Sequence, residues 1–209
     1  MTQSRLFCDI GNTHFYFYDG EKSYKVKAEG FDLSSITSDV YYISVNDFWE
    51  RKLADEKNWI NLRAMVDFSK YYGSMGIDRI ACCEAVEDAL IIDAGSAITV
   101  DKVKNGEHLG GYIYPGFNAM AKCFKDISPR LEVSFNFDID LATMPKNTRD
   151  ALSFGAMSPL VSQIREDSDT KAVIITGGDA EILLPFIPHA VIDHELVFKG
   201  MKKILEGKA

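Results

Sequence analysis

Hydrophobic and polar residues alternate along the first segment of the chain, on both sides of the pair Asp19-Gly20. This period-two pattern and the Asp-Gly pair predict a β-hairpin. A β-rich run over 39–47 follows, then a predicted helix over 48–58 and a short strand over 61–69. The first part of the chain is therefore expected to consist of strands followed by helix, and to end near Asp88.

The same order begins again at Ala89. Residues 89–117 hold three predicted strands with turns at 104–106 and 110–111, and helical stretches follow them. An apolar strand over 171–178 ends in two glycines, and helices are expected over 180–187 and 194–208. Both parts open with a strand, an Asp-x-Gly turn and a second strand. The pattern predicts two similar halves, 1–88 and 89–209, with a ligand cleft between them, although two unrelated hairpins would give it by coincidence.

Composition and charge narrow the class of protein. Apolar residues make up 46% and charged residues 26% of the 209 positions, as in ordinary globular proteins. The net charge of −8 argues against a nucleic-acid partner, which requires clustered Lys and Arg, but it allows a small anionic ligand. No leader or membrane-spanning run is visible, so no membrane association is expected. The four cysteines lack metal-site spacing, which predicts buried free thiols in a cytoplasmic protein.

The two Asp-x-Gly turns carry the first candidate chemistry. Asp9, Gly11, Asn12 and Thr13 follow one apolar strand, and the segment 93–99 repeats this arrangement. Exposed amides at a hairpin tip can hold phosphate groups, and Asp and Asn are also common in ordinary turns. Two carboxylates about 4 Å apart repel by about 4 kcal/mol at an effective dielectric near 20, as a carboxylate and a phosphate do. A phosphate site between these tips therefore requires a cation.

A third element follows the strand over 171–178. Its turn, Thr176-Gly177-Gly178, lets a flat ligand such as adenosine approach the backbone. An ordinary strand-to-helix connection with Asp179 as N-cap explains the same residues. Only the order of the three elements favours the nucleotide interpretation.

That order resembles the actin, hexokinase and Hsp70-like ATPase superfamily. The segments DIGNT, MGIDRIA, IIDAGSAITVD, GGYIYPG, NTRDALSFGA and VIITGG together resemble type III pantothenate kinase, over most of the chain. The resemblance implies an α/β, duplicated ribonuclease H-like fold, with two mixed sheets flanked by helices around a nucleotide cleft. It also implies transfer of the ATP γ-phosphate to the primary hydroxyl of pantothenate. The implied cofactors are Mg²⁺ and a monovalent cation, K⁺ or NH₄⁺, and the implied assembly is a homodimer formed through the second half.

The family's functional positions carry over one by one. Asp78 in Gly-Ile-Asp-Arg corresponds to the catalytic base, and Asp93 to the monovalent-cation ligand. The substrate-binding positions implied are Gly76, Ile77, Asp78, Arg79, Tyr72 and Thr148. The first ATP segment comprises Asp9, Ile10, Gly11, Asn12, Thr13, His14, Phe15 and Tyr16, with Asp9 organising magnesium; Ser96 is an ATP contact in the second tip. Considered without the resemblance, Asp78 and Thr148 also fit ordinary helix starts, in which their side chains have a capping role.

The chain departs from the family pattern in two places. The second tip reads Gly-Ser-Ala-Ile-Thr where the family has Gly-Thr-Ala-Thr-Thr, and the Asn-Pro that follows the family's substrate tyrosine is missing. Either Tyr71 or Tyr72 could replace that tyrosine. Two other functions stay open: a kinase or ATPase of the same fold that acts on another small acceptor, and a nucleotide-binding regulator without catalysis.

Overall fold

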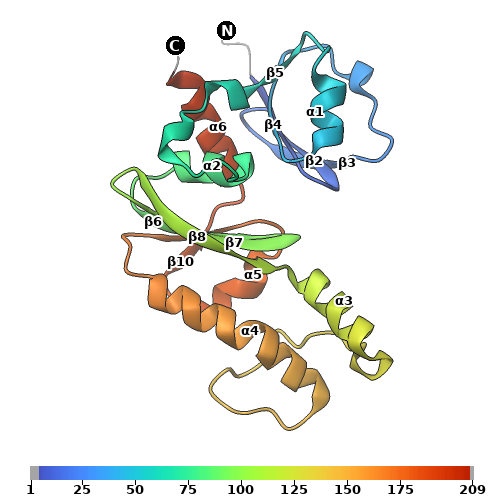
Figure 1. Ribbon diagram of the computed structural model, residues 1–209, viewed down its shortest axis with the longest axis vertical. Helices are drawn as coiled ribbons and strands as arrows, with labels where there is room; N and C mark the ends of the chain where they lie inside the picture. Colours follow the sequence, from blue (N-terminus) through green and yellow to red (C-terminus); the bar gives the residue numbers. More distant parts are fainter. Residues whose placement is uncertain (1–4, 208–209) are drawn as a thin grey trace. The chain divides into compact units, whose positions relative to one another are not determined.

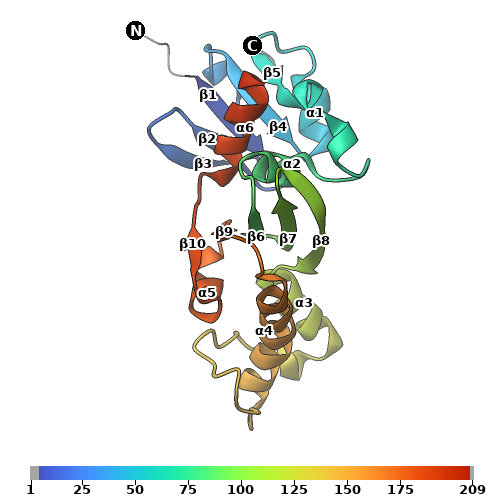
Figure 2. The same cartoon turned by 90° about the vertical axis from the view of Figure 1, so that its left-hand side faces the viewer.

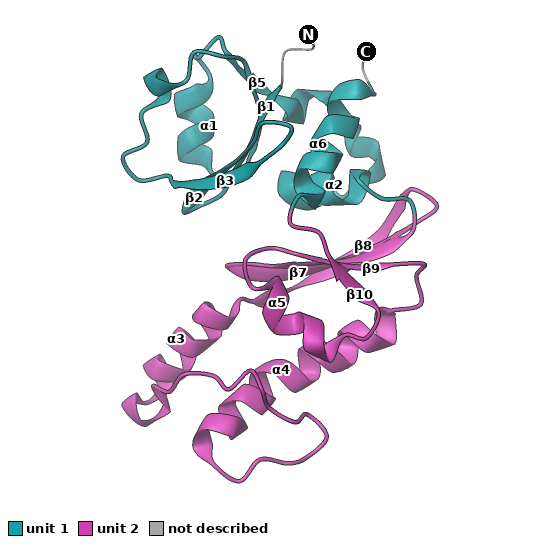
Figure 3. Cartoon of the chain, turned by 180° about the vertical axis from the view of Figure 1, so that it is seen from behind, with its two compact units in different colours: residues 1–87, 195–209 teal, residues 88–194 magenta. Residues whose placement is uncertain are grey.

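The computed structural model describes residues 5–207, which form two compact units (Figures 1 and 3). Unit 1 comprises residues 1–87 and 195–209, and unit 2 comprises residues 88–194. The division differs from the predicted halves at its C-terminal end, because the last helix belongs to unit 1. Residues 1–4, 208 and 209, which the predicted halves include, lie outside the described residues, as does the end of the helix predicted over 194–208.

Unit 1 is built on a five-stranded mixed sheet. Its order is β3-β2-β1-β4-β5, with antiparallel pairing from β3 to β1 and parallel pairing from β1 to β5. The strands are β1 (Leu6–Ile10), β2 (His14–Tyr18), β3 (Ser23–Lys27), β4 (Val40–Ser44) and β5 (Trp59–Asn61). The helices are α1 (Asp47–Leu53), α2 (Ile77–Glu84) and α6 (Leu196–Glu206), with 3-10 turns at Leu33–Ser35, Leu62–Met65 and Phe68–Lys70.

The period-two pattern of β2 explains how helices cover both faces of this sheet. Phe15 and Phe17 are fully buried, and the ring of Phe15 meets the ring of Trp49 on α1 at 4.8 Å between centroids. Tyr16 and Tyr18 point to the opposite face, where both rings contact Phe198 of α6. In Figure 1, α1 lies on one side of the strands of unit 1 and α2 and α6 lie on the other. The predicted first hairpin is confirmed, with its turn at Asp19.

Unit 2 repeats the architecture with a second five-stranded sheet. The strands are β6 (Ala89–Ala94), β7 (Ala97–Lys104), β8 (Glu107–Pro115), β9 (Val173–Thr176) and β10 (Ala190–Ile192). Its helices are α3 (Phe117–Ile127), α4 (Thr148–Asp167) and α5 (Ala180–Leu183), with 3-10 turns at Pro129–Leu131 and Leu184–Phe186. The core contains Ile92, Val100, Met157, Leu160 and Ile175. Figure 2 shows α4 and α5 against the sheet formed by β6 to β10.

The two sheets have the same topology. Unit 2 has the order β8-β7-β6-β9-β10, antiparallel from β8 to β6 and parallel from β6 to β10, so each strand has a counterpart in unit 1. Asp9 and Asp93 each occupy the penultimate position of the central strand, β1 or β6. The predicted duplication is confirmed, and coincidence of two hairpins does not explain five matching strands.

Several local predictions were wrong. The segment predicted as a strand over 61–69 forms two 3-10 turns, because Asn61 and Asp67 accept hydrogen bonds from the backbone N–H groups of Arg63 and Ser69. The predicted turn at 110–111 lies inside β8. There Gly110 takes φ +133° beside a register shift at Lys102/Val103, which is typical of a β-bulge.

Two further features differ from the sequence-based expectations. The three-residue strand β10 was not predicted at all, because it is too short for a period-two pattern. Cys8, Cys82 and Cys83 are buried and form no disulfide, as expected, but Cys123 on α3 is exposed. Among the described residues, no helix has the length and apolar character that crossing a membrane requires.

Candidate functional site

The turn between β1 and β2 forms the first tip, defined here as residues 9–13. The N–H of Gly11 donates to the carbonyl of His14 at 3.0 Å, and the N–H of Ala28 donates to the carbonyl of Thr13 at 3.0 Å. These bonds tie the tip to β2 and to the end of β3, while Asn12, Thr13 and His14 stay exposed. The tip therefore presents polar groups on a fixed backbone.

The predicted ATP segment is not uniform in its environment. Ile10 and Phe15 are completely buried, and Phe15 belongs to the aromatic core beneath α1. Tyr16 is half-buried and contacts Phe198. Any ligand contact of Ile10 and Phe15 must be made by the backbone. Asp9 is partly exposed and lies between Tyr16 of β2 and Ile43 of β4 in the sheet.

The start of α2 holds the predicted catalytic base. Gly76 is the N-cap residue and Asp78 is the second residue of the helix, so Asp78 is not the cap. One oxygen of its carboxylate, Oδ1, accepts the N–H of Arg79 at 2.8 Å. A Cβ atom on Gly76 would lie 2.5 Å from that oxygen. The glycine thus leaves the space that the carboxylate occupies, and the helix N-terminus favours its charged form.

Two neighbouring tyrosines are distinguished by their partners. The guanidinium of Arg79, a residue only 7% exposed, donates from Nη1 to the hydroxyl of Tyr72 at 2.7 Å. Tyr72 itself is 47% exposed. The hydroxyl of Tyr71 instead donates to Oε1 of Glu84 at 2.9 Å. Tyr72 and Arg79 therefore form one polar group beside Asp78, whereas Ile77 is buried in the core.

A turn from a third segment lies between the first tip and α2 within unit 1. The N–H of Val45 donates to the carbonyl of Ile10 at 3.2 Å, and Cγ1 of Val45 lies 4.0 Å from the position of a Cβ on Gly76. The first tip, the β4–α1 turn and the start of α2 thus lie at the carboxyl ends of β1 and β4. This edge is where open α/β sheets bind ligands.

Unit 2 has a second tip, defined here as residues 93–96, at the same edge of its sheet. The N–H of Gly95 donates to the carbonyl of Ala97 at 3.0 Å, as Gly11 does to His14 in the first tip. Asp93 is flanked by Thr99 of β7 and Thr176 of β9, and Ser96 is exposed.

The loops that follow β8 and β9 both bind the second tip. The N–H of Gly116 donates to the carbonyl of Ser96 at 3.1 Å, and the N–H of Asp179 donates to the carbonyl of Ala94 at 2.9 Å. Asp179 is the N-cap residue of α5, as the ordinary strand-to-helix connection predicts, although its side chain makes no capping hydrogen bond. The contact of Gly116 with the tip was not predicted from the sequence, because spacing alone does not reveal it.

Thr148 is the exposed first residue of α4, and Asn147 before it is the N-cap. The side-chain amides of Asn136 and Asn147 donate to the two carboxylate oxygens of Asp150, which lowers the pKa of this carboxyl below its ordinary value. These bonds fix the start of α4. The role of Thr148 toward pantothenate stays a prediction.

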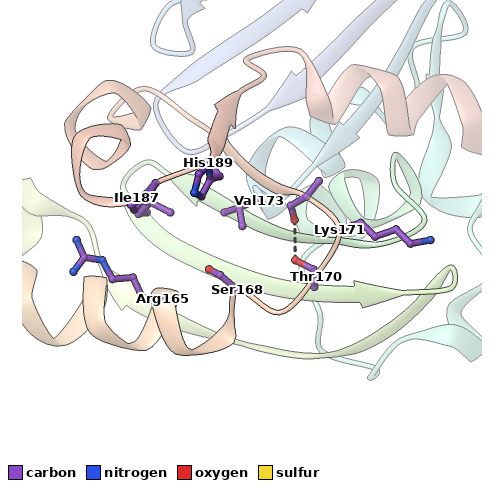
Figure 4. Close-up of a pocket in the computed structure, with 9 residues that line it drawn as sticks. Arg165, Ser168, Thr170, Lys171, Val173, Ile187 and His189 are labelled. Carbon is purple, nitrogen blue, oxygen red and sulfur yellow. Dashed lines mark hydrogen bonds between the residues drawn. The ribbon is translucent and has the colours of Figure 1, made fainter.

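A cavity of about 640 Å³ in unit 2 lies at the amino ends of β9 and β10 (Figure 4), whereas the second tip lies at the carboxyl end of β6. Residues at the end of α4 line the cavity. Val173, the first residue of β9, and His189, the residue before β10, complete the lining. Asp93 is at the carboxyl ends of the parallel strands. Arg165, in the last turn of α4, is a cation that a helix C-terminus favours, and its Nε donates to the carbonyl of Phe186 at 3.0 Å. The cavity therefore needs no anionic ligand to explain this residue.

The duplicated sheets and the two aspartate-bearing tips define a class of protein. They are the architecture of the ATPases and kinases that share the duplicated ribonuclease H-like fold. Solved structures agree: a 2-dehydro-3-deoxygalactonokinase candidate from Sinorhizobium meliloti aligns with a TM-score of 0.58 at 12% identity, over 98% of this chain and 99% of that one. At this identity the likeness concerns the fold alone.

The family follows from the sequence relatives. The family model for type III pantothenate kinase matches residues 33–168. The type III pantothenate kinase of Sulfurimonas denitrificans is 48% identical over 96% of this chain and 97% of that protein, and the enzyme of Helicobacter hepaticus is 41% identical over 96% and 98%. The chain belongs to the type III pantothenate kinase family.

A close structural relative has a different description. A crystal structure from Campylobacter jejuni, described as a candidate Baf family transcriptional activator, aligns with a TM-score of 0.88 at 39% identity. It covers 97% of this chain and 98% of that one. The same fold and length thus occur under a kinase name and under a regulatory name.

Proposed function

We propose that this chain transfers the γ-phosphoryl group of ATP to the primary hydroxyl of pantothenate. The products are ADP and 4'-phosphopantothenate, in the first step of coenzyme A biosynthesis. Membership of the family supports the reaction, and the observation that carries the proposal is the group Asp78, Arg79 and Tyr72 at the start of α2. Such a group supplies a base and two substrate-orienting donors at the edge where the first tip lies.

The chain's own residues have distinct roles in this reaction. The hydroxyl oxygen of pantothenate attacks the γ-phosphorus, and the carboxylate of Asp78 accepts the proton that this hydroxyl loses. The bond from that phosphorus to the β–γ bridging oxygen breaks, and ADP leaves. Arg79 and the hydroxyl of Tyr72 bind and orient pantothenate, whose carboxylate suits a guanidinium. Gly11, Asn12 and Thr13 of the first tip, His14 at the start of β2 and Ser96 of the second tip are proposed to contact the ATP phosphates.

The aspartates of the two tips fit the implied cations. Asp9 and Asp93 are partly exposed carboxylates on fixed strands, and carboxylate oxygens are ligands that magnesium and potassium prefer. We assign Mg²⁺ to Asp9 and a monovalent cation, K⁺ or NH₄⁺, to Asp93. Bound there, the cations would neutralise phosphate charge.

A coupled assay for ADP release tests the reaction. With pantothenate and MgATP, we expect turnover that increases when choline chloride is replaced by potassium or ammonium chloride. Other small alcohols, sugars and water alone serve as competing acceptors. Faster turnover with one of these than with pantothenate would assign the chain to another kinase or ATPase of this fold.

The variant Asp78→Asn tests the base. General-base catalysis contributes about 10² to 10⁴ in rate, so we expect a loss of this size in kcat with an unchanged thermal midpoint. Asp55→Asn is the matched control, since Asp55 is exposed in the loop after α1 and the chemical change is the same. Equal turnover in the two variants would show that Asp78 is not the base.

A regulatory function without catalysis is the second candidate, and the description of the Campylobacter jejuni structure favours it. It predicts nucleotide binding by calorimetry and no product in the pantothenate assay. The net charge of −8 gives little attraction for DNA, so a regulator of this kind would act through a protein or a nucleotide.

Two further properties are proposed with the activity. We propose a homodimer, formed through unit 2 and tested by light scattering coupled to gel filtration, which should give twice the chain mass of 23.4 kDa. We also propose a cytoplasmic location, where ATP and reduced thiols are available. Fractionation of cells that express the tagged chain tests the second point.

A further inference from the structure

Two glycines from separate loops contact the second tip so closely that no side chain fits at either position. A Cβ on Gly116, the residue before α3, would lie 2.5 Å from the carbonyl oxygen of Ser96 and nearer still to that of Gly95. A Cβ on Gly177, the residue after β9, would overlap the carbonyl oxygen of Ala94 and Oδ1 of Asp93. Real Cβ atoms essentially never approach another heavy atom within 3.0 Å.

The two glycines act on different parts of the tip. Gly116 touches backbone atoms only, and its N–H holds the carbonyl of Ser96. Gly177 touches the backbone carbonyl of Ala94 and, in addition, a side chain: one carboxylate oxygen of Asp93 also overlaps the position of its Cβ. The next residue, Gly178, has no atom within 4 Å of its own Cβ position. Close approach therefore concerns Gly177 specifically and not the Gly-Gly turn as a whole.

The duplication supplies an internal comparison for Gly177. In unit 1, Asp9 pairs with Ile43 and the next residue of β4 is Ser44. In unit 2, Asp93 pairs with Thr176 and the next residue is Gly177. Ser44 thus occupies the position equivalent to Gly177, and it carries a Cβ and an Oγ that accepts the N–H of Asn46 at 3.0 Å. The position that is a glycine beside Asp93 in unit 2 is therefore a serine beside Asp9 in unit 1.

We infer that Gly177 is a positioning residue for Asp93, and that Gly116 is a positioning residue for the backbone of the second tip. The inference rests on the proposed function, because it concerns the carboxylate assigned to the monovalent cation. The missing side chain at position 177 leaves the space in which Oδ1 of the Asp93 carboxylate lies. The two register-equivalent aspartates differ in this neighbour, which is a glycine for Asp93 and a serine for Asp9.

A purely conformational role for Gly177 makes a different prediction. Its φ of +89° is one that residues other than glycine rarely adopt, so a substitution would destabilise unit 2 even without any effect on Asp93. Stability alone therefore does not distinguish the two roles. The response of nucleotide binding to potassium does, because it depends on the carboxylate and not on the turn.

The test is calorimetric titration of the full chain with the magnesium complex of AMPPNP, in potassium chloride and in choline chloride. We expect the wild type and the control Gly155→Ala, whose helical position has open space around it, to bind more tightly in potassium. The potassium effect is the ratio of the dissociation constants in choline chloride and in potassium chloride. It should fall at least about tenfold in Asp93→Asn and in Gly177→Ser, which places the serine of unit 1 at this position. Gly116→Ala should weaken nucleotide binding in both salts.

Combining the substitutions shows whether Gly177 acts through Asp93. In the Asp93→Asn background, Gly177→Ser should change the potassium effect no further. If Gly177→Ser does not fold, the thermal midpoint of Gly177→Ala is compared with that of the double variant Gly177→Ala/Asp93→Ala. The double variant should have the higher midpoint, because it lacks the clash between the new methyl group and the Asp93 carboxylate. The inference is overturned if Gly177→Ser keeps the wild-type potassium effect or if the wild type shows no potassium effect. It is also overturned if removing the Asp93 side chain does not raise the thermal midpoint of Gly177→Ala. Turnover of pantothenate is measured separately, so a failed activity and a failed inference give different results.

Discussion

The carboxylate of Asp78 is held by two features that a sequence motif does not reveal. Its Oδ1 is fixed by the N–H of Arg79, and Gly76 leaves the space in which that oxygen lies. The motif Gly-Ile-Asp-Arg predicts a base and an anion-binding fork from the types of its residues, and these roles stay predictions. It did not separate Tyr71 from Tyr72. That distinction depends on side-chain direction around the start of α2.

The tyrosine variants test this assignment. Tyr72→Phe removes the hydroxyl that Arg79 binds at 2.7 Å, so we expect a several-fold higher KM for pantothenate with little change in kcat. Tyr71→Phe removes the bond to Glu84 and should lower the free energy of unfolding by about 1 kcal/mol without changing KM. Steady-state kinetics and urea titrations measure the two effects. The reverse pattern would assign the substrate contact to Tyr71.

Helix α6 is the element that completes unit 1. Leu196, Phe198, Met201 and Ile204 are buried, and Phe198 contacts the two tyrosine rings of β2. A Cβ on Gly200 would overlap the carbonyl group of Ala81, so α6 and α2 meet backbone to backbone. Because Asp78, the proposed base, lies in the first turn of α2, the packing of α6 against α2 helps to set its position.

Substitution of Gly200 measures how much this contact matters. Gly200→Ala places a methyl group against backbone atoms that cannot rotate away, so we expect a loss of about 3 kcal/mol in unfolding free energy, at the upper end for overpacking. Gly155→Ala on α4 is the control, where open space and higher helix propensity predict a gain of up to about 1 kcal/mol. Chemical denaturation compares them. Equal stability of both variants would show that α2 and α6 separate easily.

At the level of elements, the sequence predicted best where the pattern is local. The strands β1, β2, β6 and β9 follow from apolar runs that end in Asp-x-Gly, Asp-Gly or Gly-Gly. The segment after Trp59 was wrong because Asn61 and Asp67 cap turns that compete with strand formation. The placement of α6 was missed for a different reason. Its periodicity predicts a buried face but carries no information about which sheet covers that face.

At the scale of the whole molecule, unit 2 is an insertion between α2 and α6 of unit 1. Its sheet, its helices and its core all come from the contiguous segment 88–194. Unit 1 instead needs two separate segments, 1–87 and 195–209. The similar halves expected from the sequence are correct for the sheets and incorrect for the helix that completes the first of them.

Fragments of the chain test this organisation. We expect residues 88–194 to unfold cooperatively on heating, because the segment contains a complete core. Residues 1–87 alone should lack a cooperative transition, since Tyr16 and Tyr18 lose their cover, and joining 195–209 to them by a flexible linker should restore it. Circular dichroism follows each melt. A cooperative melt of residues 1–87 alone would show that α6 is dispensable for folding.

The return of the chain to unit 1 also has a consequence for the folding of the protein during its translation. Domains usually fold in the order in which the ribosome releases them, beginning at the N-terminus. Here the segment that leaves first must wait for α6, which is translated after all of unit 2. The nascent chain therefore completes its inserted unit before its first one, and the face of β2 that carries Tyr16 and Tyr18 stays uncovered by Phe198 throughout that interval. Translation rate through residues 88–194 thus sets how long this aromatic surface is available to chaperones.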